Sequence, residues 1–382
     1  MLSIISSVDK LQAALDKLAG LTAPDPAQAP TEAHRPRYQA VSRAYESAPA
    51  FGGLMEAYRE FGGDLERFGR VREDFRATEE ITSTTFALSL GNTLSRRMIA
   101  DYQQPDYGED LIISLKKPVP NFKLQEANII GYFGDLSDVD PETGDYQDIV
   151  PPTEFESTYT PGQKGNLLTF TRRSMLNDDI GILRRMPLRL GRAARRTHAR
   201  YVWSFFINNT NFGGDGVAIF HANHGNLGST ALGVGAVQAL IAAMRKQTEP
   251  SSGERITFGG PFHLFVPSDL EFAAKFFTLG RPLNQAAETT PFDTTLVGIV
   301  IPHVNPLFTD TNDYLVTAPV AECELIEMGY IGGNEQPELF LADQPTVGQM
   351  FVGDKLQYKI RHEYGGTCVD YRGAQKAVVA GG

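Results

Sequence analysis

The chain contains 382 residues, of which 46 are acidic and 35 are basic, so its formal net charge is −11. A composition of 42% hydrophobic and 21% charged residues is ordinary for a folded protein and excludes wholesale disorder. The negative charge argues against a general nucleic-acid binder, and two cysteines are too few for a disulfide scaffold or a cysteine-based zinc cluster.

The N-terminal part of the sequence predicts a helical arm. Aliphatic residues recur every three or four positions over 1–20, which predicts an amphipathic helix that packs on a partner helix or on its own domain. Residues 21–40 contain four prolines and predict an extended linker. A polar helical pattern follows over 38–75, and a stronger helix is expected over 83–102, capped by its first serine or threonine.

The start of the chain has neither the basic nor the apolar region of a secretory signal. No run of about 18 apolar residues occurs, so we expect no membrane-spanning helix. With so few cysteines, a reducing cytosol is the simplest compartment for this protein.

Residues 111–172 change to extended patterns. Strand-like segments lie at 112–115 and 167–170, and a Thr-Gly-Asp turn signal lies between them at 143–145. Within this region the stretch 135–160 contains eight acids and no lysine or arginine. Burying carboxylates without partners is costly, so we expect the stretch to project as a β-hairpin, with a disordered surface loop as the alternative. Its eight acids are Asp135, Asp138, Asp140, Glu142, Asp145, Asp148, Glu154 and Glu156.

Residues 177–207 predict one long helix, on the order of 45 Å at 1.5 Å per residue. Asn177 or Asp178 is expected to cap it, and Pro187 predicts a kink or a restart. Helical periodicity places the following residues on one side: Leu183, Met186, Leu190, Ala194, Thr197, Tyr201 and Phe205. It places five arginines on the other: Arg185, Arg189, Arg192, Arg196 and Arg200.

These five arginines are not neutralised within their own helix, because no acid follows Asp179 until Asp215. Like charges four residues apart repel by about 0.2–0.5 kcal/mol per pair. We favour acids of neighbouring subunits as their partners, and the acidic stretch is one source. Phosphate groups of DNA and plain solvation are the two alternatives.

The remainder mixes helices and strands without a regular alternation, which predicts an α+β fold. Helices are expected over 235–246 and 268–277, and apolar strands over 262–266 and 297–304. At 355–361 apolar residues alternate with lysine, glutamine and arginine, which predicts a half-exposed strand.

Motifs for catalysis are mostly absent: there is no P-loop, no G-x-S-x-G elbow and no H-E-x-x-H helix. His221 and His224 suggest a two-histidine metal motif, but they lie in a glycine-rich turn without an obvious third ligand. We therefore favour hydrogen bonds that shape the turn. We expect no enzyme, catalytic residue, cofactor or metal, and a metal-dependent hydrolase that uses these two histidines is the weaker alternative.

Several separated motifs follow the helical arm and the acidic hairpin in a characteristic order. They are TRRSMLNDDIG at 171–181, LGRAARRT at 190–197, DG at 215–216, FHANHGNL at 220–227 and VDYRGA at 369–374. In this order they resemble the major head proteins, or major capsid proteins, of Mu-type tailed phages and prophages. These proteins have the capsid fold named after phage Hong Kong 97. The resemblance covers about residues 84–377.

The resemblance implies an α+β fold with an N-terminal arm, an extended E-loop, a P-domain with a long spine helix, and an A-domain. The implied boundaries are 1–110 for the helical arm, 111–210 for the E-loop hairpin (123–172) and spine helix (177–208) of the P-domain, 211–345 for the A-domain, and 346–382 for the C-terminal P-domain strands.

The implied function is that of a major capsid subunit that self-assembles as hexamers and pentamers into an icosahedral head around double-stranded DNA, without sequence specificity. The expected partners are further copies of the chain, a portal protein, and cement or decoration proteins. No association with a membrane is expected. The expected location is the virion, after assembly in the host cytoplasm. In such shells the E-loop lies over an adjacent subunit, where the eight acids would find partners.

One departure from the family pattern concerns covalent cross-linking. Some relatives cross-link through an E-loop lysine, but no lysine lies between Lys123 and Lys164 here. We therefore expect non-covalent contacts or a cement protein to stabilise the shell. An encapsulin-like nanocompartment of the same fold, which encloses an enzyme cargo, is the alternative to a phage head.

Overall fold

The structure is a computed structural model. It describes residues 7–28, 35–51, 83–103, 106–130, 133, 135–139, 144, 146, 148–149, 154–171, 182–249, 253–278, 296–342, 353 and 355–381. Among these residues no helix is both long enough and apolar enough to span a lipid bilayer.

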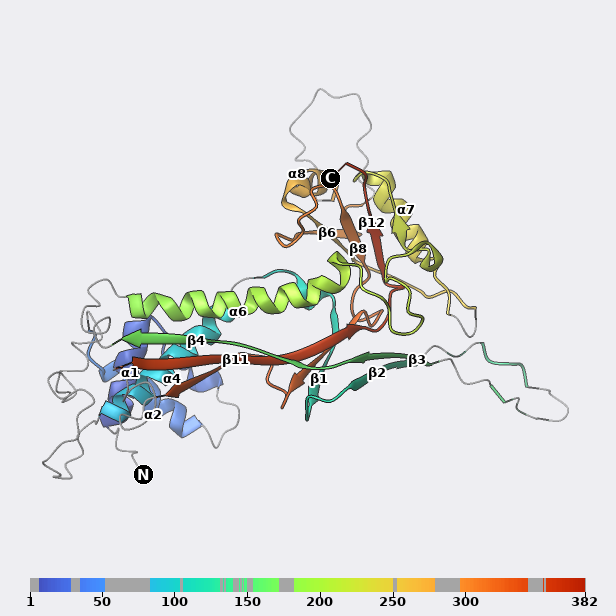
Figure 1. The fold of residues 1–382 in the computed structure, drawn as a ribbon. Coiled ribbons are helices and arrows are strands. Elements are labelled where there is room, and N and C mark those ends of the chain that lie inside the picture. Colours follow the sequence, from blue (N-terminus) through green and yellow to red (C-terminus); the bar gives the residue numbers. More distant parts are fainter. Residues whose placement is uncertain are drawn as a thin grey trace, which may run out of the picture. The chain divides into compact units, whose positions relative to one another are not determined.

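The helices and strands are labelled in Figure 1. The α-helices are α1 (Ser7–Ala19), α2 (Arg35–Ser47), α4 (Ser83–Tyr102), α6 (Ile182–Ile207), α7 (Val234–Met244) and α8 (Glu271–Thr278). Short 3-10 helices are η1 (Pro26–Gln28), η3 (Glu109–Leu111), η4 (Ala222–His224) and η5 (Ser268–Leu270). The strands are β1 (Ile113–Val119), β2 (Gln125–Ile130), β3 (Glu154–Tyr159), β4 (Gly162–Thr171), β5 (Leu227–Gly228), β6 (Phe262–Val266), β7 (Val300–Val304), β8 (Tyr314–Thr317), β9 (Ile326–Ile331), β10 (Glu338–Ala342), β11 (Lys355–Cys368) and β12 (Ala374–Ala377).

The chain forms two compact units, each built from segments that are far apart in the sequence. Unit 1 contains Met1–Pro105, Gln163–Arg195 and Glu335–His362, and unit 2 contains Asp106–Gly162, Arg196–Asn334 and Glu363–Gly382. Helix α6 and strand β11 are each divided between the two units: α6 after Arg195 and β11 after His362. The mixed content of helices and strands confirms the predicted α+β class.

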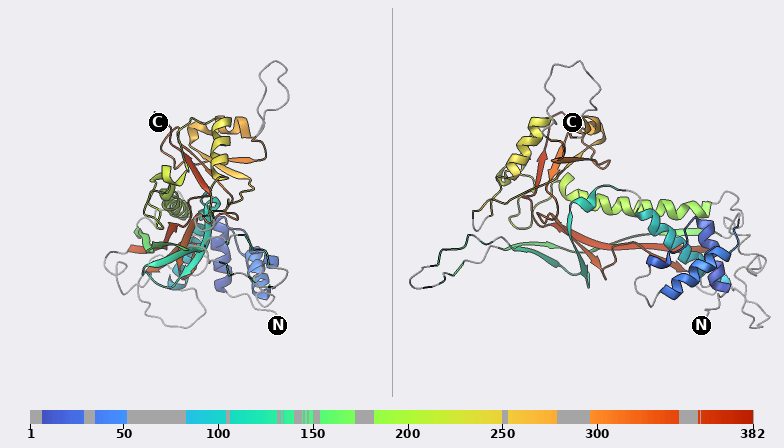
Figure 2. Two further views of the ribbon diagram at one scale, coloured as in Figure 1. Left: turned by 90° about the vertical axis from the view of Figure 1, so that its right-hand side faces the viewer. Right: turned by 180° about the vertical axis from the view of Figure 1, so that it is seen from behind.

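In unit 1, α1 packs against α2 and α4 (Figure 2). Leu11, Leu15 and Leu18 are buried, as the spacing over 1–20 predicts. A buried carboxylate fixes the contact with α4, because Asp16 accepts a hydrogen bond from Thr93 Oγ1 at 2.9 Å and lies 2.8 Å from Arg96 Nη1. The helix predicted over 83–102 is confirmed as α4.

The extended linker predicted over 21–40 is wrong at its end, because α2 already begins at Arg35. Proline is well tolerated in the first turn of a helix, where its missing N–H has no intrahelical partner. Pro36 occupies that turn. Pro36 therefore belongs to the start of helix α2 and not to the linker.

Unit 1 also contains a sheet in which the first part of β11 pairs with β10 and with β4. The alternation predicted at 355–361 is confirmed: Tyr358 and Ile360 are buried, whereas Lys355 and Lys359 are exposed. The buried face meets α4, where the Tyr102 ring makes an edge contact with the ring of His362.

Unit 2 contains the main hydrophobic core, around a sheet with the order β5-β12-β8-β6-β7. Helix α7 lies beside this sheet in Figure 1. The second part of α6 completes the core: the Trp203 ring packs on Phe265 and Phe308, and its Nε1 donates a hydrogen bond to the Tyr107 carbonyl at 2.9 Å. The strand predicted over 262–266 is confirmed as β6.

The single long helix predicted over 177–207 is confirmed from Ile182 onward, and it continues through Pro187 without a restart. The predicted apolar side is partly wrong, because Thr197 is exposed and Tyr201 is only half-buried. In the second part of α6 the buried side chains are His198, Ala199, Val202, Trp203 and Phe206. They occupy an arc that is rotated from the predicted one, because this part of α6 is covered by Tyr107, by strand β6 and by the loop around Phe308.

The remaining strands of unit 2 form two further arrangements. β1 pairs with β9 in parallel, and β9 pairs with the end of β11 in antiparallel orientation. β2 and β3 form a separate antiparallel ribbon, in which Gln125 lies opposite Tyr159 and Ile130 opposite Glu154. The predicted hairpin is thus confirmed at its base.

A histidine pair links β6 to β7. His263 Nδ1 lies 3.0 Å from His303 Nε2, and the His303 ring stacks on Phe265. Burial lowers the pKa of both imidazoles, and the charge of protonated His263 lowers the pKa of His303 further. Asp106 partly offsets this by raising the pKa of His303.

We predict that acid weakens the fold through this histidine pair. An exposed histidine has a pKa of about 6.5, so below that pH the unfolded chain binds more protons than the folded chain. The free energy of unfolding should therefore fall as the pH drops from about 7 to about 5. Denaturant unfolding at several pH values measures this slope. His303→Gln should flatten it, and an unchanged slope would contradict the role of the pair.

Candidate assembly surfaces

The root of the β2–β3 ribbon is held by one aromatic side chain. Along β3, Ser157 and Tyr159 are buried, whereas Glu156 and Thr158 are exposed. Tyr159 Oη donates a hydrogen bond to Glu327 Oε1 at 3.0 Å. Burial raises the pKa of the Tyr159 phenol well above its usual value, and the Glu327 charge adds to this rise. The hydroxyl therefore stays a donor over the whole physiological range.

Two glycines make room for this ring. Gly329 of β9 and Gly365 of β11 lie opposite each other in the ladder. A Cβ atom at Gly329 would overlap the Tyr159 hydroxyl, and one at Gly365 would lie 3.0 Å from the Tyr159 ring. A third glycine, Gly213, lies against Ser157 in the same way. Glycine fits these positions because only it lets the ribbon approach the backbone so closely.

Beyond this root, the chain between β2 and β3 exposes both acidic and apolar side chains. Of the predicted acids, Asp135, Asp138, Asp148 and Glu156 are exposed, Glu154 lies in β3, and Asp140, Glu142 and Asp145 lie outside the described residues. Apolar residues lie between these acids, and the charge pattern alone assigns them no role. Phe133, Leu136, Val139, Tyr146 and Ile149 are all exposed, with Leu136 at 88% and Tyr146 at 85%. We call residues 131–153 the excursion.

The arginines of α6 form an exposed face. Arg189, Arg192, Arg196 and Arg200 are all exposed, and their spacing of three and four residues puts them on one side of the helix. The side chain of Arg185 lies outside the described residues. Arg195 differs from the others, because its guanidinium group lies over the Tyr102 ring, 5.5 Å from its centroid.

The histidine turn at 219–226 is a structural unit. The buried His224 ring stacks on Tyr371, with its Nε2 2.8 Å from Asp215 Oδ2 and its Nδ1 2.9 Å from the Ile219 carbonyl. His221 Nδ1 accepts a hydrogen bond from the Asn223 amide. No cluster of three potential metal ligands occurs among the described residues. Both ring nitrogens of His224 are thus engaged in shaping the turn, which confirms the predicted hydrogen-bonding role.

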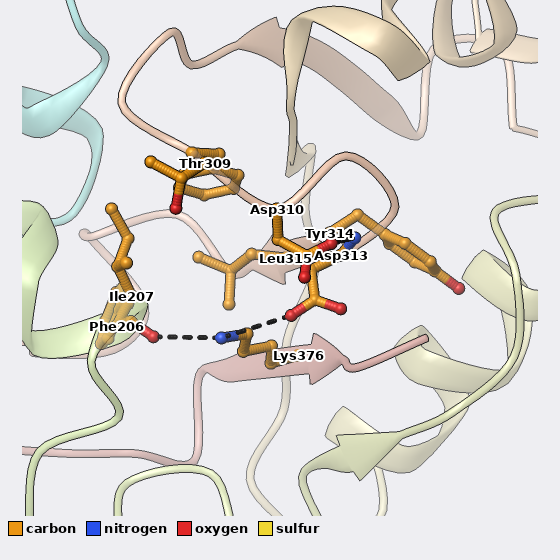
Figure 3. Close-up of a pocket in the computed structure, with 9 residues that line it drawn as sticks. Phe206, Ile207, Thr309, Asp310, Asp313, Tyr314, Leu315 and Lys376 are labelled. Atoms are coloured by element: carbon orange, nitrogen blue, oxygen red, sulfur yellow. Dashed lines mark hydrogen bonds and ion pairs between the residues drawn. The ribbon is translucent and has the colours of Figure 1, made fainter. Parts of the chain in front are cut away.

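A cavity of about 180 Å³ lies in unit 2 (Figure 3). Lys376 points into it and lies 3.7 Å from Asp313 Oδ2 and 3.5 Å from the Phe206 carbonyl. Apolar side chains such as Leu315 and Ile207 line much of the rest. With its ammonium group paired in this way, Lys376 joins the end of α6 to β12.

We compared the chain with known protein families and with known proteins. The family described as phage capsid protein matches residues 154–377. No curated protein matches the chain.

Several solved capsid structures are similar to this chain at low sequence identity. The structure titled Gordonia phage Cozz is 13% identical, covers 72% of this chain and 87% of that one, and has a TM-score of 0.43. The capsid of cyanophage P-SCSP1u is 11% identical over 70% of this chain and 86% of that one, with a TM-score of 0.45. A virus-like particle from Pyrococcus furiosus is 9% identical over 75% and 98%, with a TM-score of 0.42.

We predict that the root of the ribbon depends on the glycine at 329. Gly329→Ala should lower the free energy of unfolding by about 1–3 kcal/mol, because its methyl group forces the Tyr159 ring out of place. Tyr159→Phe should cost about 1–3 kcal/mol, because it removes the donor to the buried Glu327. Denaturant unfolding measures both changes. Gly235→Ala is the matched control, since a Cβ atom there has no neighbouring atom within 4 Å and alanine favours the helix. A Gly329→Ala variant as stable as this control would contradict the anchoring role.

Proposed function

The chain belongs to the phage capsid protein family, and from that membership we propose that its copies assemble as hexamers and pentamers into an icosahedral head around double-stranded DNA. As a major capsid subunit the protein is structural and not enzymatic, and its place is the virion. The match over 154–377, which covers more than half of the chain, carries this proposal. The closer relationship to Mu-type phages stays a prediction.

Within this proposal the chain has the parts of a Hong Kong 97-type subunit. The arm is 1–110, the E-loop hairpin and spine helix lie in 111–210, the A-domain is 211–345, and the last P-domain strands lie in 346–382. The excursion is the tip of the E-loop, and α6 is the spine helix. The position of the E-loop is supported by the β2–β3 ladder, which brackets the excursion.

A shell of this kind is held together by many weak contacts that symmetry repeats. The excursion presents acids and apolar side chains to the outside, and α6 presents an arginine face. We assign both to contacts between neighbouring copies, in which carboxylates of one copy meet basic groups of the next. Because no lysine lies between Lys123 and Lys164, these contacts are non-covalent, and a cement or decoration protein reinforces them.

The net charge of −11 suits a DNA container. A strongly basic wall would bind packaged DNA through many phosphates and hinder its movement into and out of the head. A negative wall avoids this, so the DNA is enclosed without sequence-specific contacts. A portal protein through which the DNA moves and assembly in the host cytoplasm belong to the same proposal.

Imaging of the expressed full-length chain tests the proposal directly. We expect capsomer rings or closed shells in electron micrographs and a very large species in sedimentation. A compact monomer that persists at high protein concentration would overturn the proposed function. Closed shells that contain an enzyme cargo in place of nucleic acid would favour the encapsulin-like alternative.

A second prediction concerns the arginine face. Reversing the charge of Arg189 and Arg192 to Glu should lower the yield of shells by about tenfold or more, because a loss of about 1.4 kcal/mol per contact already changes an equilibrium tenfold. The subunit itself should stay folded, since both side chains are exposed. Sedimentation and circular dichroism measure the two effects. Lys246→Glu with Arg255→Glu is the matched control, as both residues are exposed and neither belongs to α6. Normal shells from the Arg189 and Arg192 variant would refute the assignment.

A further inference from the structure

Two histidines of unit 2 lie side by side on the strands β6 and β7. They are 40 residues apart in the sequence, so no motif predicts their pairing. In the parallel ladder His263 lies opposite Ile301, and His303 lies opposite Phe265. Because alternate residues of a strand point to the same face, both imidazoles project from one face of the sheet. Their facing nitrogens, His263 Nδ1 and His303 Nε2, are 3.0 Å apart.

One aromatic side chain holds both imidazoles in place. The His303 ring stacks on Phe265, with 5.2 Å between the ring centroids, and the His263 ring lies 6.4 Å from the same side chain. Phe265 is fully buried and packs on Trp203 of α6. The two imidazoles are therefore preorganised, and a ligand that joins them loses little side-chain entropy on binding.

The two rings are both accessible and neutral. Each is only partly buried, and among the other histidines that the structure describes only His221 shares this partial exposure. Burial lowers the pKa of both rings, so each is neutral at pH 7 and has one nitrogen with a free lone pair. The neutral imidazole is the form that binds metal ions. Asp106 adds negative charge nearby, since it raises the pKa of His303.

The separation of the facing nitrogens suits a shared metal ion. Zinc binds imidazole nitrogen at about 2.0–2.1 Å in a tetrahedral arrangement, which places two such nitrogens about 3.3 Å apart. The rings reach this separation when they move apart by about 0.3 Å. Imidazole ligands select zinc, copper and nickel, whereas magnesium and calcium require oxygen ligands.

We propose that His263 Nδ1 and His303 Nε2 together bind one divalent metal ion of the zinc class. The hydrogen atom that lies between the two nitrogens moves to the outer nitrogen of the ring that carries it. Two neutral rings then ligate the ion without net release of a proton. No third histidine, cysteine or carboxylate completes a cluster among the described residues, so water molecules take the remaining coordination positions. Both ligands belong to one chain, so the site does not depend on assembly.

The bound ion ties an edge strand to the sheet. β7 is the last strand in the order β5-β12-β8-β6-β7, and β6 is its neighbour. A ligand that binds the folded chain and not the unfolded chain stabilises the fold in proportion to its concentration relative to its dissociation constant. Metal binding at the pair therefore stabilises unit 2 at the edge that β7 forms.

Titration of the full-length chain, made without a histidine tag, with zinc chloride tests the site. We expect one zinc ion per chain by calorimetry and a rise in the denaturant midpoint that EDTA reverses. His263→Gln and His303→Gln should each weaken zinc binding by about tenfold or more, because each leaves a single imidazole. His221→Gln is the matched control and should bind zinc like the unmodified chain. Magnesium chloride should leave the midpoint unchanged.

Copper gives a readout that does not depend on the folding of any variant. The electron paramagnetic resonance spectrum of Cu²⁺ bound to the unmodified chain should show coupling to two imidazole nitrogens. Coupling to fewer than two, absence of zinc binding, or zinc binding that both glutamine variants retain overturns this inference. Loss of zinc binding in the His221→Gln chain places the metal at the histidine turn and overturns it too. All these results leave the capsid function standing, because imaging of shells tests that function separately.

Discussion

The close contact of the Tyr159 ring with two opposite glycines is the constraint on which the projecting part of this protein depends. An exposed two-stranded ribbon is only marginally stable by itself, so it needs a fixed base. Gly329 and Gly365 supply the space, and the buried Glu327 accepts the hydrogen bond that fixes the ring. A buried carboxylate without such a donor would be strongly unfavourable, so the ribbon and the β9–β11 ladder stabilise each other.

Because the root is fixed, ordering the excursion on docking costs little conformational entropy. A fully flexible segment of this length would lose a large conformational entropy on binding, about 1–2 kcal/mol for each residue ordered. An excursion held at both ends, by β2 and by β3, has fewer conformations to lose. In the proposed assembly, modest contacts by exposed side chains such as Leu136 and Tyr146 then suffice for each copy, and a closed shell repeats them with every subunit.

Local patterns predicted local structure well. The helix over 83–102, the strand over 262–266 and the alternation at 355–361 all depend on neighbouring residues, and each is confirmed. Contacts between distant residues were not predictable. Tyr159 meets Gly329 and Lys359 meets Phe340 only because strands far apart in sequence pair in one register. The arc that α6 buries likewise depends on Phe265 and Phe308, which no helical period reveals.

Acids alternate with apolar residues in the excursion, so the charge pattern alone does not predict how this segment behaves in solution. A segment with Leu136 and Tyr146 almost fully exposed is prone to associate without specificity. Adjacent carboxylates oppose this, because two such segments repel each other until a basic surface neutralises them. The absence of lysine between Lys123 and Lys164 keeps that repulsion uniform along the whole segment. In the proposed assembly the same acids therefore serve two purposes: they keep the free subunit from aggregating, and they direct the excursion to basic groups of a neighbouring copy.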